Sequence, residues 1–187
     1  MNWQDQVNAL RNAIVGGDSE AQQLQFYAID SAVGECEKFP QELFDALMAM
    51  FAQLKIKKCD DVSGYFRVFE NNLDLMADSQ RAVLSESIES TFGDLSDPAS
   101  MVLALEILVH SQSPAQVVQQ LRRMATSTTK PPLSVLPYGV RYLLEQDEAT
   151  EPIYEQCVKL LQRLTEHHDK QVSSQANVEL QRVLRGS

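Results

Sequence analysis

Three histidines have the spacing that could serve a metal ion or a proton transfer. Glu106 and His110 lie four residues apart, so a helix would place both on one face. His167, His168 and Asp169 are adjacent and together offer two imidazoles and a carboxylate. Adjacent residues on a helix point about 100° apart, however, and the helix dipole accounts for a histidine near a helix C-terminus. We therefore expect solvated helix-end residues here, with no metal and no cofactor.

A carboxylate pair and a thiol are the other candidates for catalysis. Glu86 and Glu89 lie three residues apart, but paired carboxylates act as general acid and base only in a walled cleft. Cys59 follows a segment with three lysines, whose charge would favour the thiolate. No histidine lies near Cys59 in the sequence to act as its base, so an inert and partly buried thiol is the simpler interpretation.

The sequence lacks the motifs of the common enzyme classes. It contains no GxSxG nucleophile elbow, no GxxxxGKS/T phosphate loop, no GxGxxG fingerprint and no HExxH zinc motif. These motifs require particular backbone geometry, which makes them hard to disguise. We therefore predict that the protein is not an enzyme. The alternative is an enzyme with an unrecognised site that uses Glu86, Glu106 or His110.

Residue types that are common in protein interfaces gather between positions 138 and 151. Two tyrosines and an arginine share one expected helix, and both types are enriched in interface hot spots. A run of acidic residues follows. Burial in a core would explain the tyrosines equally well, and capping of the next helix would explain the acids. The predicted protein-binding residues are Tyr138, Arg141, Tyr142, Glu145, Asp147, Glu148 and Glu151.

The elements that must position these residues are helices, because apolar residues recur at helical spacing along the whole chain. Asp97-Pro98, Ser113-Pro114 and Thr150-Glu151-Pro152 each read as an N-cap followed by a proline in the first turn. Such a cap stabilises a helix by about 1 kcal/mol. We predict an all-α chain of about ten helices, which begin near residues 2, 19, 40, 60, 78, 97, 114, 133, 151 and 170.

The pattern also assigns an apolar stripe to each helix. In the second helix, which Asp18 or Ser19 would cap, the stripe is carried by Leu24, Tyr27 and Ala28. The last helix carries its stripe on Val172, Val178, Leu180 and Leu184.

Alternate helix starts are about 38, 38, 36 and 37 residues apart, within the range of helical-repeat proteins. Short links make neighbouring helices antiparallel, so the expected unit is an αα-hairpin. At fold level this pattern resembles the HEAT and armadillo class of helical-repeat proteins. The resemblance implies an α-solenoid of five stacked hairpins in a single domain, residues 1–187. An irregular helical bundle is the alternative.

The stretch 126–136 interrupts this regularity with serine, threonine and proline residues. Its composition favours a mobile loop. Proline inside a helix costs about 3 kcal/mol, so the eighth helix is expected to begin near Pro137.

The net charge is −10, and it is unevenly distributed. Residues 1–50 carry −6, residues 51–95 carry −3, residues 96–144 carry +2 and residues 145–187 carry −3. This balance argues against binding to nucleic acid or to an anionic membrane surface. It favours a basic protein partner, although acidity could also serve solubility alone.

Three widely spaced cysteines and the lack of a secretory signal or a long apolar run predict a cytoplasmic protein. The most economical reading is a non-enzymatic protein-binding module: a stoichiometric inhibitor, an immunity-type or a chaperone-type protein for a basic partner. A self-assembling structural scaffold, and hence a homo-oligomer, is the alternative.

Overall fold

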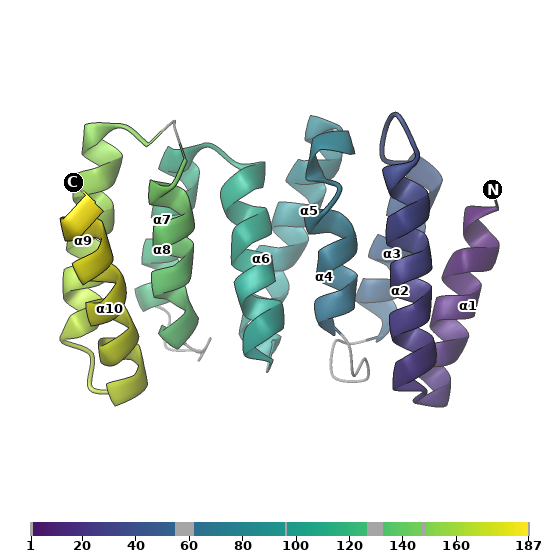
Figure 1. The fold of residues 1–187 in the computed structure, drawn as a ribbon, viewed down its shortest axis with the longest axis horizontal. Coiled ribbons are helices and arrows are strands. Elements are labelled where there is room, and N and C mark those ends of the chain that lie inside the picture. Colours follow the sequence, from purple (N-terminus) through teal and green to yellow (C-terminus); the bar gives the residue numbers. More distant parts are fainter. Residues whose placement is uncertain (1, 55–61, 96, 127–132, 147–148, 187) are drawn as a thin grey trace. The chain divides into compact units, whose positions relative to one another are not determined.

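A computed structural model describes residues 2–54, 62–95, 97–126, 133–146 and 149–186 (Figure 1). These ranges hold ten α-helices and three short 3-10 helices, and no strand, which confirms the all-α prediction. None of the helices in these ranges is both long and apolar enough to cross a membrane. The α-helices are α1 (Trp3–Gly16), α2 (Ser19–Gly34), α3 (Gln41–Leu54), α4 (Val62–Glu70), α5 (Asp78–Thr91), α6 (Pro98–Ser111), α7 (Pro114–Thr126), α8 (Leu136–Leu144), α9 (Glu151–Thr165) and α10 (Lys170–Gly186). The 3-10 helices are η2 (Leu73–Leu75), η3 (Phe92–Asp94) and η4 (Leu133–Val135).

Most of the predicted helix ends are confirmed by their hydrogen bonds. Asp18 and Asp97 each accept a hydrogen bond from a first-turn amide, at 3.0 Å and 2.8 Å. Gly17 ends α1 in the left-handed conformation, with φ at 68°, where a side chain would be strained. Pro137 lies in the first turn of α8, as its missing N–H requires. Thr150 is the N-cap residue of α9, with a proline in the first turn, as predicted, but its side chain makes no capping hydrogen bond.

The chain divides into two compact units, residues 1–103 and residues 104–187, and the division falls within α6. The two units are described separately below. Of the expected mobile loop at 126–136, residues 127–132 lie outside the described residues, whereas Leu133–Val135 form η4.

In the N-terminal unit, α1 contacts both α2 and α3, and α2 contacts α4. These contacts put α1 and α3 in one layer and α2 and α4 in another. Aromatic rings from α3 and from the residues just before it pack on α4: Phe51 stacks on Tyr65 with ring centroids 4.4 Å apart, and Phe39 stacks on Phe69 at 5.6 Å. Such pairs add to the stabilisation that burial alone gives.

In the C-terminal unit, α7 contacts α8 and α9, while α10 contacts α8, α9 and η4. Gly139 lets α8 lie close to its neighbours, since a Cβ atom there would stand 3.0 Å from Cδ2 of Leu121. In both units these contacts between α-helices join a helix to the next one or the next but one in the sequence. This pattern of helix contacts is compatible with stacked hairpins.

The apolar stripe that the sequence assigned to α2 is the exposed one. Leu24 is 61% exposed and Tyr27 is 74% exposed. The buried face of α2 is instead Gln22, Phe26, Ile29 and Val33. The prediction was wrong because α2 has apolar residues on two faces, and its contacts with α1 and α4 decide which face is covered.

A similar difference occurs in α10. Val178 and Leu184 are 46% and 51% exposed, while Val172 and Ala176 are buried as the helix packs on α9. The buried face also includes Glu179, whose carboxylate accepts hydrogen bonds from Gln175 and Arg182 on the same helix.

Candidate functional site

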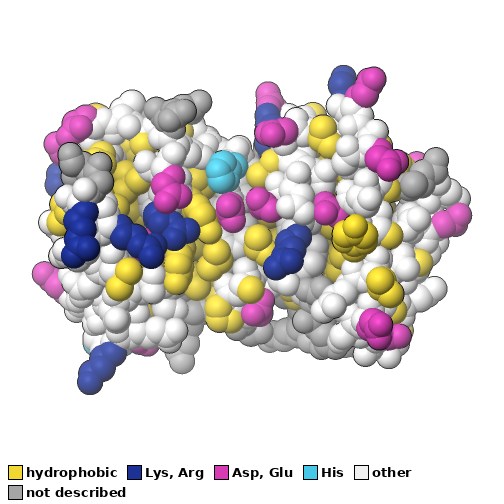
Figure 2. Space-filling model, viewed as in Figure 1, with side chains coloured by type: hydrophobic (Ala, Val, Ile, Leu, Met, Phe, Trp, Pro, Cys, Tyr) yellow, Lys and Arg dark blue, Asp and Glu magenta, His cyan; other side chains and the backbone are white. Residues whose placement is uncertain are grey.

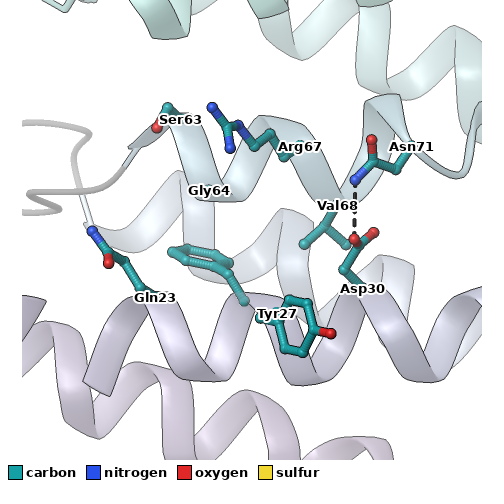
Figure 3. Close-up of a pocket in the computed structure, with 9 residues that line it drawn as sticks. Gln23, Tyr27, Asp30, Ser63, Gly64, Arg67, Val68 and Asn71 are labelled. Carbon is teal, nitrogen blue, oxygen red and sulfur yellow. Dashed lines mark hydrogen bonds between the residues drawn. The ribbon is translucent and has the colours of Figure 1, made fainter. Parts of the chain in front are cut away.

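An open groove of about 520 Å³ runs between α2 and α4 in the N-terminal unit (Figure 3). We call it the α2–α4 groove. Its lining residues are Gln23, Phe26, Tyr27, Asp30, Ser63, Gly64, Arg67, Val68 and Asn71.

The apolar part of the groove comes from α2. Phe26 and Val68 are buried, so they form its floor, whereas Tyr27 stands at its edge. Leu24, one turn before Tyr27 on the same exposed face, extends the apolar surface together with Ala28. We call these three residues the α2 strip. Hydrophobic side chains are visible at the surface over α2 in Figure 2, and exposed apolar groups beside a groove are typical of interaction sites.

The polar part of the groove is organised around Asp30. Its Oδ2 accepts a hydrogen bond from Nδ2 of Asn71 at 2.9 Å, and its Oδ1 accepts one from Nδ2 of Asn72 at 2.7 Å. Nδ2 of Asn72 also donates to the backbone oxygen of Val68 at 2.8 Å. Because both asparagines directly follow α4, Asp30 ties α2 to the end of α4.

Arg67, on α4, is the other charged residue that lines the groove. Figure 3 shows its side chain directed away from Asp30. Arg67 is exposed, and its side chain makes no ion pair or hydrogen bond with any residue in the described part of the chain. A carboxylate and a guanidinium therefore line the same groove without pairing.

The net charge of the chain lies in the unit that holds this groove. Residues 1–103 include seventeen acidic and seven basic residues, a net charge of −10, whereas residues 104–187 include nine of each.

In the C-terminal unit, α8 brings together four of the seven residues predicted to bind protein. The guanidinium of Arg141 lies 4.7 Å from the ring centroid of Tyr142 and 5.6 Å from that of Tyr138. Its Nε lies 3.5 Å from Oε1 of Glu145. Figure 2 shows basic side chains gathered over α8 and α10. Burial, and then the nearby Glu106 carboxylate, raise the pKa of Tyr142. We call Tyr138, Arg141, Tyr142 and Glu145 the α8 cluster.

Of the other three predicted binding residues, the structure describes Glu151 alone. Glu151 is the exposed first residue of α9. Asp147 and Glu148 lie outside the described residues.

The histidine-containing segments do not form a metal centre in the described ranges, where no group of three or more potential ligands is found. Nδ1 of His110 lies 2.9 Å from the backbone oxygen of Glu106, so the ring engages the backbone and not the carboxylate. His167 and His168 have ring centroids 4.2 Å apart. The carboxylate of Asp169 accepts a hydrogen bond from a first-turn amide of α10 at 2.8 Å, which is a capping role.

The remaining candidates for chemistry are apart from one another. Glu86 and Glu89 are exposed on α5. Burial raises the pKa of the Cys157 thiol to about 12, so this thiol stays protonated near neutral pH. Cys36 is half-buried, and Cys59 lies outside the described residues.

Comparisons of the chain with protein-family models, with curated proteins and with solved structures gave no match.

The sequence interpretation missed the α2–α4 groove, although one signal was present. Phe26, Ile29 and Val33 repeat at helical spacing within the same helix as Leu24 and Tyr27. When such a helix packs on its neighbours through one apolar face, the other apolar face stays exposed. That second face is a candidate surface for a partner.

Proposed function

We propose that the protein is a non-enzymatic protein-binding module whose partner docks in the α2–α4 groove. The observation that supports this proposal is the exposure of Leu24 and Tyr27 beside an open groove. Covering large apolar side chains removes them from water and favours association, and tyrosine is enriched among the residues that dominate interface energies.

The charge of the N-terminal unit supports a basic partner. A net charge of −10 on the unit that holds the groove attracts a cationic protein over several ångströms and raises its association rate. This attraction is screened by salt. The association rate should therefore fall steeply as the ionic strength rises, while the apolar contacts keep the dissociation rate less affected.

Size, charge and helix order favour a narrower assignment, which is part of the proposal. A small, acidic, helical protein of the cytoplasm is suited to be a stoichiometric inhibitor, an immunity-type protein or a chaperone-type protein. Its stacked hairpins would make it HEAT-like, with helix faces available as binding surfaces. The α8 cluster is a second candidate contact, since Arg141 is held against two tyrosine rings and is thereby pre-oriented.

Co-purification from the native host and a direct affinity measurement test the proposal. We expect Tyr27→Ser to weaken binding of the recovered partner by about tenfold or more, as loss of a hot-spot residue does. Val83→Ser is the matched control, because Val83 is 49% exposed on α5 and does not line the groove. Equal affinities for both variants and the unchanged protein would contradict docking at the groove. An affinity that does not change with salt would contradict a basic partner.

Exposed apolar residues on the last helix favour self-assembly as the second candidate function. Val178 and Leu184 are exposed on α10, and contact with a second copy of the chain would remove them from water. Light scattering over a range of concentrations separates the two functions. A mass that rises with concentration, and that Val178→Ser lowers, would support the scaffold.

A further inference from the structure

The two charged residues that line the α2–α4 groove differ in their hydrogen bonding. Asp30 directs both of its oxygens to the amides of Asn71 and Asn72. Both oxygens of Asp30 are therefore engaged by neutral donors, and the guanidinium of Arg67 has no hydrogen-bond or ion-pair partner among the described residues. The two formal charges that line the groove sum to zero, but only the guanidinium of Arg67 has hydrogen-bond donors that no described residue uses, although the surrounding unit carries −10.

A guanidinium in this position is suited to a carboxylate or a phosphate, and of these only the carboxylate occurs on unmodified protein side chains. Its planar set of N–H donors matches a carboxylate in two parallel hydrogen bonds, and such bonds are shorter and stronger than neutral ones. The floor of the groove is apolar where Phe26 and Val68 are buried, and the ring of Tyr27 stands at its edge. A ligand that uses both parts of the groove must carry an apolar side chain and a carboxylate close together.

We propose that Arg67 is a specificity-determining residue of the groove, and that it pairs with the side-chain carboxylate of an Asp or Glu that lies next to an apolar residue in the partner. This inference rests on the proposed function. The partner is basic as a whole, which guides its approach, and acidic at this one position, which fixes how it docks. The partner's net positive charge is thus attracted by the acidic unit, whereas the single group that pairs with Arg67 is negative.

This opposition provides a test that general electrostatics cannot mimic. Arg67→Glu changes the net charge of the unit from −10 to −12. If only the overall charge mattered, the variant would bind a basic ligand more tightly. If Arg67 pairs with a carboxylate, the variant would bind more weakly, because two like charges would face each other. Lys38→Glu is the matched control, since Lys38 is exposed in the same unit, does not line the groove, and gives the same net charge of −12.

The probe is a short, acetylated and amidated peptide of Lys, Ala and Leu that carries a single Glu beside a Leu, labelled for fluorescence anisotropy. A second peptide has Gln in place of Glu. A third has Gln and a free C-terminal carboxylate. We expect the Glu peptide to bind about fivefold more tightly than the Gln peptide, which is the upper range for a solvent-exposed ion pair. Arg67→Glu should remove this preference, whereas Lys38→Glu should leave it in place and tighten the binding of both peptides.

Each other outcome decides between the two proposals. Equal binding of the Glu and Gln peptides, weakened for both by Tyr27→Ser, would overturn the role of Arg67 and leave the groove as a docking surface. Preference for the third peptide would replace the side-chain carboxylate by a chain terminus and so overturn the inference as stated. Failure of all three peptides to bind would count against the groove itself. Urea unfolding of each variant verifies that it is folded, which we expect because Arg67 and Lys38 are exposed.

Discussion

Replacing Asp30 with alanine removes the carboxylate that ties α2 to the end of α4. Its two amide partners differ in their surroundings, since Asn72 is only 4% exposed whereas Asn71 is exposed. Water can replace Asp30 at Asn71 with little loss. At Asn72 one N–H keeps its bond to Val68, but the other loses a charged acceptor in a place that water reaches poorly. A buried donor left without a partner costs about 1 to 3 kcal/mol. We therefore expect Asp30→Ala to lower the free energy of unfolding by about 2 kcal/mol.

The assay is urea unfolding at neutral pH, followed by the helical circular dichroism signal. Asp45→Ala is the control, because Asp45 accepts a single hydrogen bond, from Gln41 at 2.8 Å, on the exposed face of α3. It should change the unfolding free energy by less than about 0.5 kcal/mol. Double-mutant cycles separate the two bonds of Asp30: we expect a coupling energy of about 1 to 2 kcal/mol with Asn72 and less than about 0.5 kcal/mol with Asn71. Equal effects of Asp30→Ala and Asp45→Ala, or no coupling with Asn72, would refute the reasoning.

Three further predictions test burial, capping and the state of a thiol. Tyr27→Ser should change the unfolding free energy by less than about 0.5 kcal/mol because Tyr27 is exposed, whereas Phe26→Ala, one residue away, should lower it by about 3 kcal/mol. Similar unfolding free energies for the two variants in urea would contradict the assignment of the exposed and buried faces of α2. Asp97→Ala should lower thermal stability by an amount equivalent to about 1 kcal/mol, and Thr150→Ala should have almost no effect, since only the first side chain caps a helix. Cys157 should resist alkylation at pH 8 in the folded protein, as peptide mass mapping would detect. Because folding raises the pKa of this thiol from 9.0 to about 12, the stabilisation by its protonated form is complete below pH 9 and is lost as the pH rises from 9 to about 12.

The positions of the helices could be predicted from the sequence because their ends depend on local chemistry. A residue that caps, a proline in the first turn and a glycine that adopts positive φ all act within a few residues of the end that they define. The predicted starts at 19, 78, 114 and 151 accordingly coincide with the observed starts of α2, α5, α7 and α9. Thr150 occupies the predicted N-cap position without the side-chain hydrogen bond, because a suitable residue type permits such a bond without ensuring it.

The face that a helix buries could not be predicted in the same way. Which face of α2 is buried depends on how the helix packs against α1 and α4, which the spacing within α2 does not determine, because α2 offers an apolar set on each side. The α2–α4 groove follows from that choice, so it was missed. The sequence also could not predict that the guanidinium of Arg67 has no partner among the described residues. That depends on the hydrogen bonds that Asp30 accepts from two asparagines about forty residues further along the chain.

The proximity of Tyr138, Arg141 and Tyr142 on α8 could be predicted from their spacing. Tyr138 and Tyr142 are four residues apart, so a helix places them on one side, and Arg141 is adjacent to Tyr142. The spacing did not predict that the guanidinium would lie against both rings or that Glu145 would approach its Nε, because these depend on side-chain rotamers. Whether this cluster binds a protein stays a prediction.

The two-faced character of α2 has a consequence for how the gene can vary. Folding constrains Phe26, Ile29 and Val33, since any polar replacement there would disturb the core. It imposes no comparable requirement on Leu24 or Tyr27, and random substitution would soon replace them with the polar residues common on helix surfaces. Apolar side chains that persist at these two positions in related genes would therefore record selection by a binding partner, independently of selection for stability.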